Sequence, residues 1–178
     1  LKTTQVKITN NRTSQDVITV SSIKKGDTVK VYDKASGGKL LGSKKATGTS
    51  LNLTVKQLSQ KARKAYVSVT KTGLLESSRV GVSYKAEPSA PLKASQLTIK
   101  NDKGKSDTIT VKSIQKGDTI KVYTKASGGK LLVSKKSAGT STTLSVKQLG
   151  KKAGSVYISM TKSGLLESSK VKASFKKE

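Results

Sequence analysis

The sequence predicts an all-β protein made of two tandem antiparallel β-sandwiches of about seven strands each. The chain repeats itself, because Lys25–Ser50 returns almost letter for letter as Lys116–Ser141. Within each copy, valine, isoleucine, leucine and tyrosine alternate with polar residues in short runs bounded by glycine, asparagine and aspartate. This period-2 pattern is typical of half-buried strands, and no long helical pattern separates the runs.

The repeat also defines the domains. Leu1–Glu87 aligns without a gap to Leu92–Glu178 and matches it at about three positions in five, as in repeat architectures. Each copy is long enough to bury its own core. The segment between the copies holds both prolines of the chain, which indicates a short, stiff linker. We therefore predict repeat 1 at residues 1–87, the linker at 88–91 and repeat 2 at 92–178.

The first half of repeat 1 predicts three strands. Asn10 and Asn11 indicate a turn after the first strand, and the Lys-Gly-Asp sequence at residues 25–27 indicates a turn before the third. On the third strand, valines occupy one face, whereas Lys30 and Tyr32 occupy the other. The predicted strands are Gln5–Asn10, Asp16–Val20 and Thr28–Asp33.

The second half of repeat 1 predicts four more strands. The Ser-Gly-Gly sequence at residues 36–38 supplies the positive φ angles that a tight hairpin requires. Residues 56–64 lack the period-2 pattern, so we expect a loop or a single helical turn there. The predicted strands are Lys39–Ala46, Ser50–Val55, Ala65–Thr70 and Ser77–Tyr84, and repeat 2 is expected to follow the same plan.

Short strands with one apolar face favour a two-sheet sandwich of the immunoglobulin type, with a barrel as the alternative. Tyr66 and Tyr157 stand at the start of the sixth strand of each repeat, roughly where a tyrosine corner would lie. An ordinary core or rim tyrosine is the other interpretation. Tyr84 is expected to point inward, and its hydroxyl is expected to be dispensable because repeat 2 has Phe175 instead.

Four motifs occur in both repeats: K-G-D-T-[VI]-K-V-Y, A-S-G-G-K-L-L, V-K-Q-L and G-L-L-E-S-S. Together they make the sequence resemble the tandem bacterial immunoglobulin-like modules of secreted and wall-associated Gram-positive proteins. The resemblance implies a β-sandwich unit in an extracellular or cell-wall-associated string of domains, attached to an enzyme or to an adhesive surface protein. It implies no conserved active site. The high lysine content departs from that family and needs its own explanation.

Composition argues against an enzyme. The chain has no histidine and no cysteine, so the usual general base and nucleophile pairs are missing, as are thiolate metal ligands and disulfides. Asp27 and Asp118 follow glycine in a turn and are expected to accept local backbone hydrogen bonds. Glu76 and Glu167 are expected to pair with a neighbouring lysine. We predict no catalytic residues, no metal site and no cofactor.

Positive charge is the strongest functional signal. The chain has 36 basic and 10 acidic residues, and both repeats share the excess, with 17 basic and 5 acidic residues in repeat 1 and 19 and 5 in repeat 2. Such a field attracts polyanions. Only three basic residues are arginines, and lysine reads bases poorly. We predict an extracellular adhesion module that binds DNA, teichoic acid or sulfated glycans non-specifically. The module is expected to be a monomer without membrane insertion. The alternatives are a spacer or stalk and an accessory carbohydrate-binding module of a secreted enzyme.

The predicted polyanion-binding residues combine lysine-rich hairpins with the outward face of the third strand. By alternation, Arg79 is expected beside Lys30 and Tyr32 on that face. The alternative is that an outward tyrosine only covers its cross-strand neighbours. The full set is Lys30, Tyr32, Lys34, Lys39, Lys44, Lys45 and Arg79 in repeat 1 and Lys121, Tyr123, Lys125, Lys130, Lys135, Lys136 and Lys170 in repeat 2.

Overall fold

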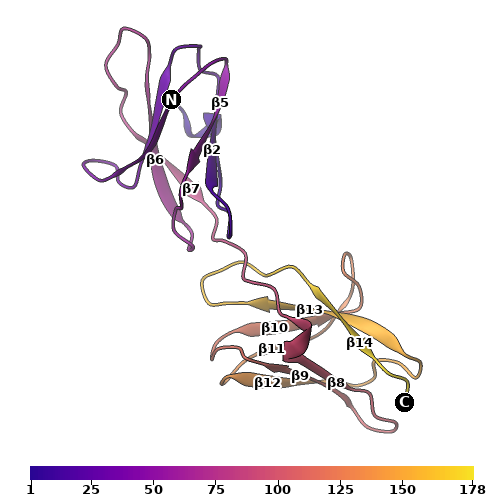
Figure 1. Cartoon of the computed structure of the whole chain (residues 1–178). Helices are drawn as coiled ribbons and strands as arrows, with labels where there is room; N and C mark the ends of the chain where they lie inside the picture. The colour runs from indigo at the N-terminus through magenta and orange to yellow at the C-terminus, as the bar shows by residue number, and fades with distance from the viewer. The chain divides into compact units, whose positions relative to one another are not determined.

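The computed structural model describes all residues from Leu1 to Glu178 and divides into two compact units, Leu1–Glu87 and Pro88–Glu178. Each unit packs a three-stranded antiparallel sheet against a four-stranded one (Figure 1). The prediction of an all-β chain with two seven-stranded sandwiches is therefore confirmed.

In repeat 1 the three-stranded sheet has the order β1-β2-β5 and the four-stranded sheet the order β4-β3-β6-β7. The third strand thus shares a sheet with the last two, as the immunoglobulin-type arrangement predicts. A 3₁₀ turn, η1 (Thr3–Gln5), precedes the first strand where the sequence had predicted strand from residue 5. The strands are β1 (Val6–Thr9), β2 (Asp16–Ser21), β3 (Thr28–Tyr32), β4 (Leu40–Lys45), β5 (Ser50–Val55), β6 (Arg63–Thr70) and β7 (Val80–Tyr84).

Repeat 2 has the same topology, with sheet orders β12-β9-β8 and β11-β10-β13-β14. The register is also the same, since Val31 pairs with Val67 in repeat 1 and Val122 with Ile158 in repeat 2. Its elements are η2 (Ala94–Gln96), β8 (Leu97–Lys100), β9 (Asp107–Lys112), β10 (Thr119–Tyr123), β11 (Leu131–Lys136), β12 (Ser141–Val146), β13 (Gly154–Thr161) and β14 (Val171–Phe175).

Each core lies between the two sheets of its own repeat. On β3 every second residue faces inward, and Val29 and Val31 are fully buried there. Leu53 on β5 and Val67 on β6 meet them from the two sheets. Because the repeats bury separate clusters, each has the apolar interior that an independent domain requires.

The last strand of repeat 1 starts later than the sequence predicts. Strand was expected from Ser77, but β7 begins at Val80. The Ser77 amide donates to the Val69 carbonyl at 3.0 Å, and the Ser77 hydroxyl accepts from the Val69 amide at 3.1 Å. These two bonds hold the segment against the end of β6 and away from the β7 ladder. Residues 56–62 form a loop without a helical turn.

Buried aspartates tie the loops to the sandwich. Asp16 is fully buried, and its two carboxylate oxygens accept from the Asn11 amide at 2.6 Å and the Leu58 amide at 2.5 Å. Asp27 accepts from the Lys24 amide at 2.9 Å, which confirms its expected role in the turn. The counterparts in repeat 2 are Asp107 and Asp118.

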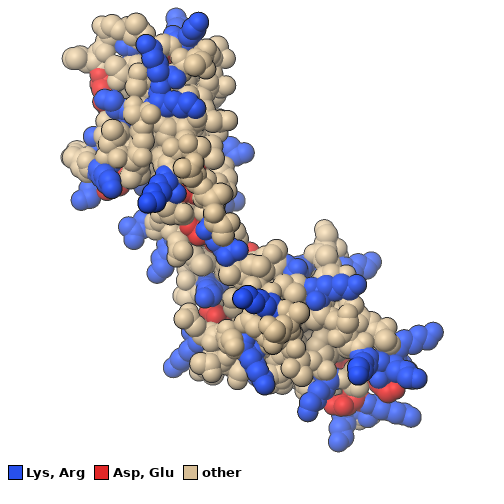
Figure 2. All heavy atoms as spheres, viewed as in Figure 1, with Lys and Arg blue, Asp and Glu red and all other residues tan.

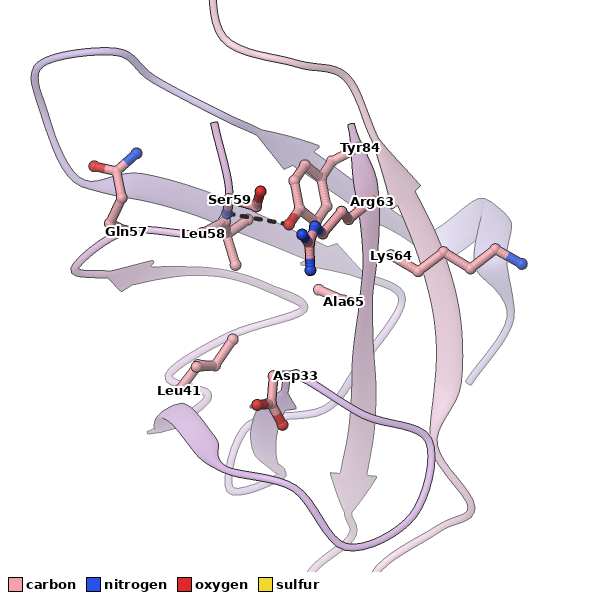
Figure 3. Close-up of a pocket in the computed structure, with 9 residues that line it drawn as sticks. All are labelled: Asp33, Leu41, Gln57, Leu58, Ser59, Arg63, Lys64, Ala65 and Tyr84. Atoms are coloured by element: carbon pink, nitrogen blue, oxygen red, sulfur yellow. Dashed lines mark hydrogen bonds between the residues drawn. The ribbon is translucent and has the colours of Figure 1, made fainter. Parts of the chain in front are cut away.

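Tyr66 makes no tyrosine-corner hydrogen bond, which agrees with the alternative of an ordinary rim tyrosine. Tyr66 pairs with Tyr32 on the outward face of the sheet, because its neighbours on β6 take the inward positions. Tyr84 points inward instead, and its hydroxyl accepts a hydrogen bond from the Ser59 amide at 3.2 Å (Figure 3). The Tyr84 hydroxyl therefore has a backbone partner in repeat 1, and its dispensability stays a prediction. Phe175 fills this position in repeat 2 without that bond.

Candidate functional site

A hydrogen-bonded network covers the outward face of β3 in repeat 1. The Glu76 carboxylate, in the loop after β6, accepts from the Lys30 ammonium at 2.6 Å and from the Tyr32 hydroxyl at 2.8 Å. The Ser68 hydroxyl donates to the same carboxylate at 2.5 Å. The Arg79 guanidinium stacks on the Tyr32 ring, 3.3 Å from its centroid. Glu76 thus joins three side chains from two strands.

Arg79 is also anchored to the β3–β4 hairpin. Its guanidinium donates to the Lys34 carbonyl at 2.9 Å and to the Gly37 carbonyl at 2.5 Å. Gly37 and Gly38 take positive φ angles of 57° and 74°, as the hairpin sequence predicts. A Cβ atom at residue 38 would also lie 2.8 Å from the Cβ atom of Lys34, so the close approach and the positive φ both favour glycine there.

Repeat 2 builds the same network. Glu167 accepts from Lys121 and Tyr123 at 2.8 Å each and from Ser159 at 2.6 Å. Lys170 replaces the arginine and places its ammonium 3.6 Å from the centre of the Tyr123 ring. The network recurs because both repeats have the same fold and carry lysine, tyrosine, serine and glutamate at equivalent positions.

These contacts shift the pKa values of the groups involved. Hydrogen bonds from Lys30, and then from Ser68 and Tyr32, lower the pKa of Glu76 to about 2 against the opposing effect of burial. In repeat 2, burial acts to raise the pKa of Glu167, but the hydrogen bonds of its partners outweigh it and lower the pKa to about 2. The hydrogen bond to Glu76 raises the pKa of Lys30. Both lysines are therefore held in charged pairs with carboxylates.

The network changes the interpretation of six predicted polyanion-binding residues. The expected proximity of Arg79 to Lys30 and Tyr32 is confirmed, as is the pairing of both glutamates with lysine. However, the charges and hydroxyls on this face already have partners within the protein. The side chains concerned are Lys30, Tyr32, Arg79, Lys121, Tyr123 and Lys170.

Two further predicted residues bridge the sheets. The Lys44 ammonium donates to the Asn52 carbonyl on β5 at 3.0 Å, and the Lys135 ammonium donates to the Thr143 carbonyl on β12 at 2.8 Å. Both lysines lie on edge strands, β4 and β11, and reach across the open side of the sandwich. The remaining predicted lysines are exposed and pair with no carboxylate; they are Lys34, Lys39, Lys45, Lys125, Lys130 and Lys136.

Most carboxylates of the chain are engaged in internal hydrogen bonds. Four aspartates are buried on backbone amides, the two network glutamates bind lysine, and Glu87 and Glu178 accept from glutamines. The structure contains only two salt bridges for 36 basic residues. Figure 2 accordingly shows basic side chains over both repeats with few acidic ones between them. The surface charge is therefore largely uncompensated.

The sequence analysis did not identify the serine that donates to each network glutamate, Ser68 to Glu76 and Ser159 to Glu167. Ser68 and Ser159 are fully buried, although both lie on the outward face of their strands. A serine at the same place in both repeats, one strand away from a lysine, could have indicated a covered polar network.

No cluster of three or more histidine, cysteine, aspartate or glutamate residues is positioned to hold a metal ion. The hollow in Figure 3 contains one carboxylate, Asp33, which accepts from the Lys39 amide at 2.7 Å. None of the helices has the length and apolar character needed to cross a bilayer.

The sequence matches no known protein family and no curated protein. Among solved structures, a chain of a cytokine receptor complex is 10% identical, with 96% of this chain and 95% of that one covered and a TM-score of 0.54. A biofilm-associated protein BSP domain is 13% identical over 97% of this chain, which spans 29% of that chain, with a TM-score of 0.36. The FN1–FN3 domains of chicken CNTN1 are 12% identical over 97% of this chain and 63% of theirs, with a TM-score of 0.39. The likeness at 0.54 supports the fold alone, a tandem immunoglobulin-like β-sandwich.

Glu76→Gln is expected to destabilise repeat 1 by about 1 kcal/mol at neutral pH, because the carboxylate loses charge-assisted hydrogen bonds near the surface. The pKa of Glu76 is lowered in the folded state from its ordinary value of 4.5 to about 2. Its contribution is therefore complete above pH 4.5 and disappears as the pH falls toward 2. Urea unfolding at several pH values measures the difference between the two proteins.

A matched control is Asp102→Asn, because the Asp102 carboxylate makes no hydrogen bond in the structure. It is expected to leave the stability of its own repeat unchanged over the same pH range. A Glu76→Gln penalty that stays constant down to pH 2 would contradict the assigned pKa.

Proposed function

We propose that this chain is a non-catalytic extracellular adhesion module that attaches to polyanions through exposed lysines of both repeats. The observation that carries the proposal is the disposition of charge: the carboxylates are mostly turned to internal donors, while the lysine ammonium groups remain at the surface. A surface of this kind holds phosphate or sulfate polymers by releasing their counterions. The tandem sandwich fold and the resemblance of the repeated motifs to Gram-positive surface modules support an extracellular or cell-wall location.

The proposed binding surface is narrower than the set predicted from sequence. It comprises the lysines that flank the β3–β4 hairpin and the end of β4, together with their equivalents in repeat 2. We leave out the network side chains and the two bridging lysines, because they already make hydrogen bonds or, for Lys170, stack on a tyrosine ring. The proposed residues are Lys34, Lys39, Lys45, Lys125, Lys130 and Lys136.

The chemistry of these residues favours DNA, teichoic acid or sulfated glycans without sequence preference. Lysine is a flexible point charge, so it follows a phosphate or sulfate backbone but does not read base edges. Two repeats on one chain present two such surfaces, and linking weak sites raises the overall affinity above that of either one.

A spacer or stalk is the second candidate function. The observation that favours it is the same even charge on both repeats, since like charges on neighbouring domains repel and keep a string of modules extended and soluble.

Binding to duplex DNA and to heparin is expected to weaken steeply with salt. The logarithm of the association constant should fall linearly with the logarithm of salt concentration, with a slope of about 0.9 per phosphate neutralised on duplex DNA. Changing the six proposed lysines to glutamine should lower both the affinity and this slope. Fluorescence anisotropy at several salt concentrations measures both quantities.

The control removes the same number of charges elsewhere. Six exposed lysines outside the hairpins are changed to glutamine in this control. Lys100 is included because the repeat 2 counterpart of Lys7 is Thr98. The six residues are Lys7, Lys56, Lys61, Lys100, Lys147 and Lys152. An equal loss in both variants would assign binding to diffuse charge. Absence of binding at low salt would reject polyanion attachment and favour the spacer.

A further inference from the structure

The segment that joins the repeats is docked on a loop of repeat 2. The Ser89 amide and the Ser89 hydroxyl both donate to the Leu166 carbonyl at 2.8 Å. The same hydroxyl accepts from the Lys162 amide at 2.9 Å. Pro88 forms a parallel bridge with Leu166. The predicted linker thus pairs with the loop between β13 and β14 as a short added strand.

Docking covers residues on both sides of this contact. Ser89 is only 1% exposed, and Leu92, three residues later, is 3% exposed and belongs to the core of repeat 2. Leu166 is 44% exposed. The segment therefore covers Leu166 only in part, and it brings Leu92 into the core of repeat 2.

Repeat 1 has the same turn at the tip of the corresponding loop, although there the loop is closed by an antiparallel bridge between Thr70 and Glu76. The Leu74 amide donates to the Lys71 carbonyl at 3.0 Å, and the Leu165 amide donates to the Lys162 carbonyl at the same distance of 3.0 Å. Both turns have glycine with positive φ at the matching position, 77° at Gly73 and 80° in repeat 2. The turn is thus formed without a docked segment.

In repeat 1 this loop is uncovered. Leu75, the counterpart of Leu166, is 94% exposed, and Leu74 is 64% exposed. Leu74 also lines a hollow beside Ile23 and Thr72. Two neighbouring leucines with this exposure on a domain rich in charge indicate a surface that a partner covers.

The polar groups of the loop match the docked serine as well. In repeat 2 the Ser89 hydroxyl lies between the Lys162 amide and the Leu166 carbonyl. The equivalent groups in repeat 1 are the Lys71 amide and the Leu75 carbonyl, which flank the bridge between Thr70 and Glu76. Across this antiparallel bridge the two groups face each other, and neither bonds to a residue outside the loop. A serine could therefore make the same three hydrogen bonds there.

We propose that the Lys71–Glu76 loop of repeat 1 is a docking site for an extended proline-serine segment, like Glu87–Pro91, joined to the chain directly ahead of Leu1. Leu1 is the counterpart of Leu92 and is only partly buried, so a segment entering at this point would follow the path seen in repeat 2. Modules linked in this way form an array in which each linker serves as an added strand of the module that follows it.

The test compares the full chain with a version that carries Glu-Pro-Ser-Ala-Pro directly before Leu1. The extension is expected to slow hydrogen exchange of the Lys71 amide about tenfold, because that amide gains a hydrogen bond. It should also shift the methyl resonances of Leu75 and raise the melting temperature of repeat 1. Two-dimensional NMR and calorimetry measure these effects.

The matched control is the same extension with its serine changed to alanine, which keeps both prolines and removes the hydroxyl. It is expected to lose the protection of the Lys71 amide. Ser89→Ala in the unextended chain should likewise speed exchange at Lys162, which shows that the assay detects this contact. The docking site in repeat 1 is refuted if Ser89→Ala has that effect but the serine-containing extension changes neither the exchange of the Lys71 amide nor the methyl resonances of Leu75.

Discussion

Val31→Asp is expected to unfold repeat 1 and to leave repeat 2 folded. Val31 is fully buried on β3, where it pairs with Val67 and Gly42. An unpaired carboxylate at this position would cost roughly 5 kcal/mol or more, which is comparable to the whole stability of a small domain. Calorimetry should show the transition of repeat 2 alone, and NMR should show the dispersed signals of one repeat.

Ser43→Asp is the matched control. Ser43 is exposed and lies opposite Lys30 on the outward face of β4, so the same new charge should be tolerated there. Val122→Asp should give the reverse result and unfold repeat 2 alone. Simultaneous loss of both repeats with either valine variant would show that the two sandwiches do not fold independently.

Asp16→Ala is expected to destabilise repeat 1 by roughly 2 to 4 kcal/mol, since it removes a buried carboxylate and leaves two partly buried backbone amides without an acceptor. Asp16 accepts from the Asn11 amide and from the Leu58 amide, which lies 42 positions away along the chain. The carboxylate thus ties the β1–β2 loop to the loop that follows β5. Urea unfolding of the variant measures the loss.

Asp16→Asn keeps one of the two acceptor oxygens, so its destabilisation should lie between those of the native protein and Asp16→Ala. Asp107→Ala should destabilise repeat 2 in the same way, because Asp107 makes the equivalent bonds. A loss below about 0.5 kcal/mol for Asp16→Ala, the range of an ordinary surface substitution, would contradict the capping role.

The strands were largely predictable because burial in a sandwich imposes a period of two. The pattern of β5 assigns alternate residues to the core, and Leu51, Leu53 and Val55 are all buried. The start of β7 was not predictable in this way. Ser77 continues the alternation, but its hydrogen bonds to Val69 hold it outside the ladder.

The candidate site was predictable only in part. Alternation correctly placed Lys30, Tyr32 and Arg79 on one face, but it could not show that Glu76 joins them. Likewise, the sequence could not show which tyrosine contacts the loop after β5, and Tyr84 rather than Tyr66 does so.

The sequence by itself determined the repeat, the two sandwiches, the face taken by each strand residue and the excess of lysine. These properties depend on local patterns and composition. The tertiary structure decided which charges are free, because Lys30 meets Glu76 across 46 positions of the chain and Lys44 reaches the opposite sheet. Alternation specifies the side of a sheet on which a residue lies, whereas its partner depends on which distant loop the fold brings to that side.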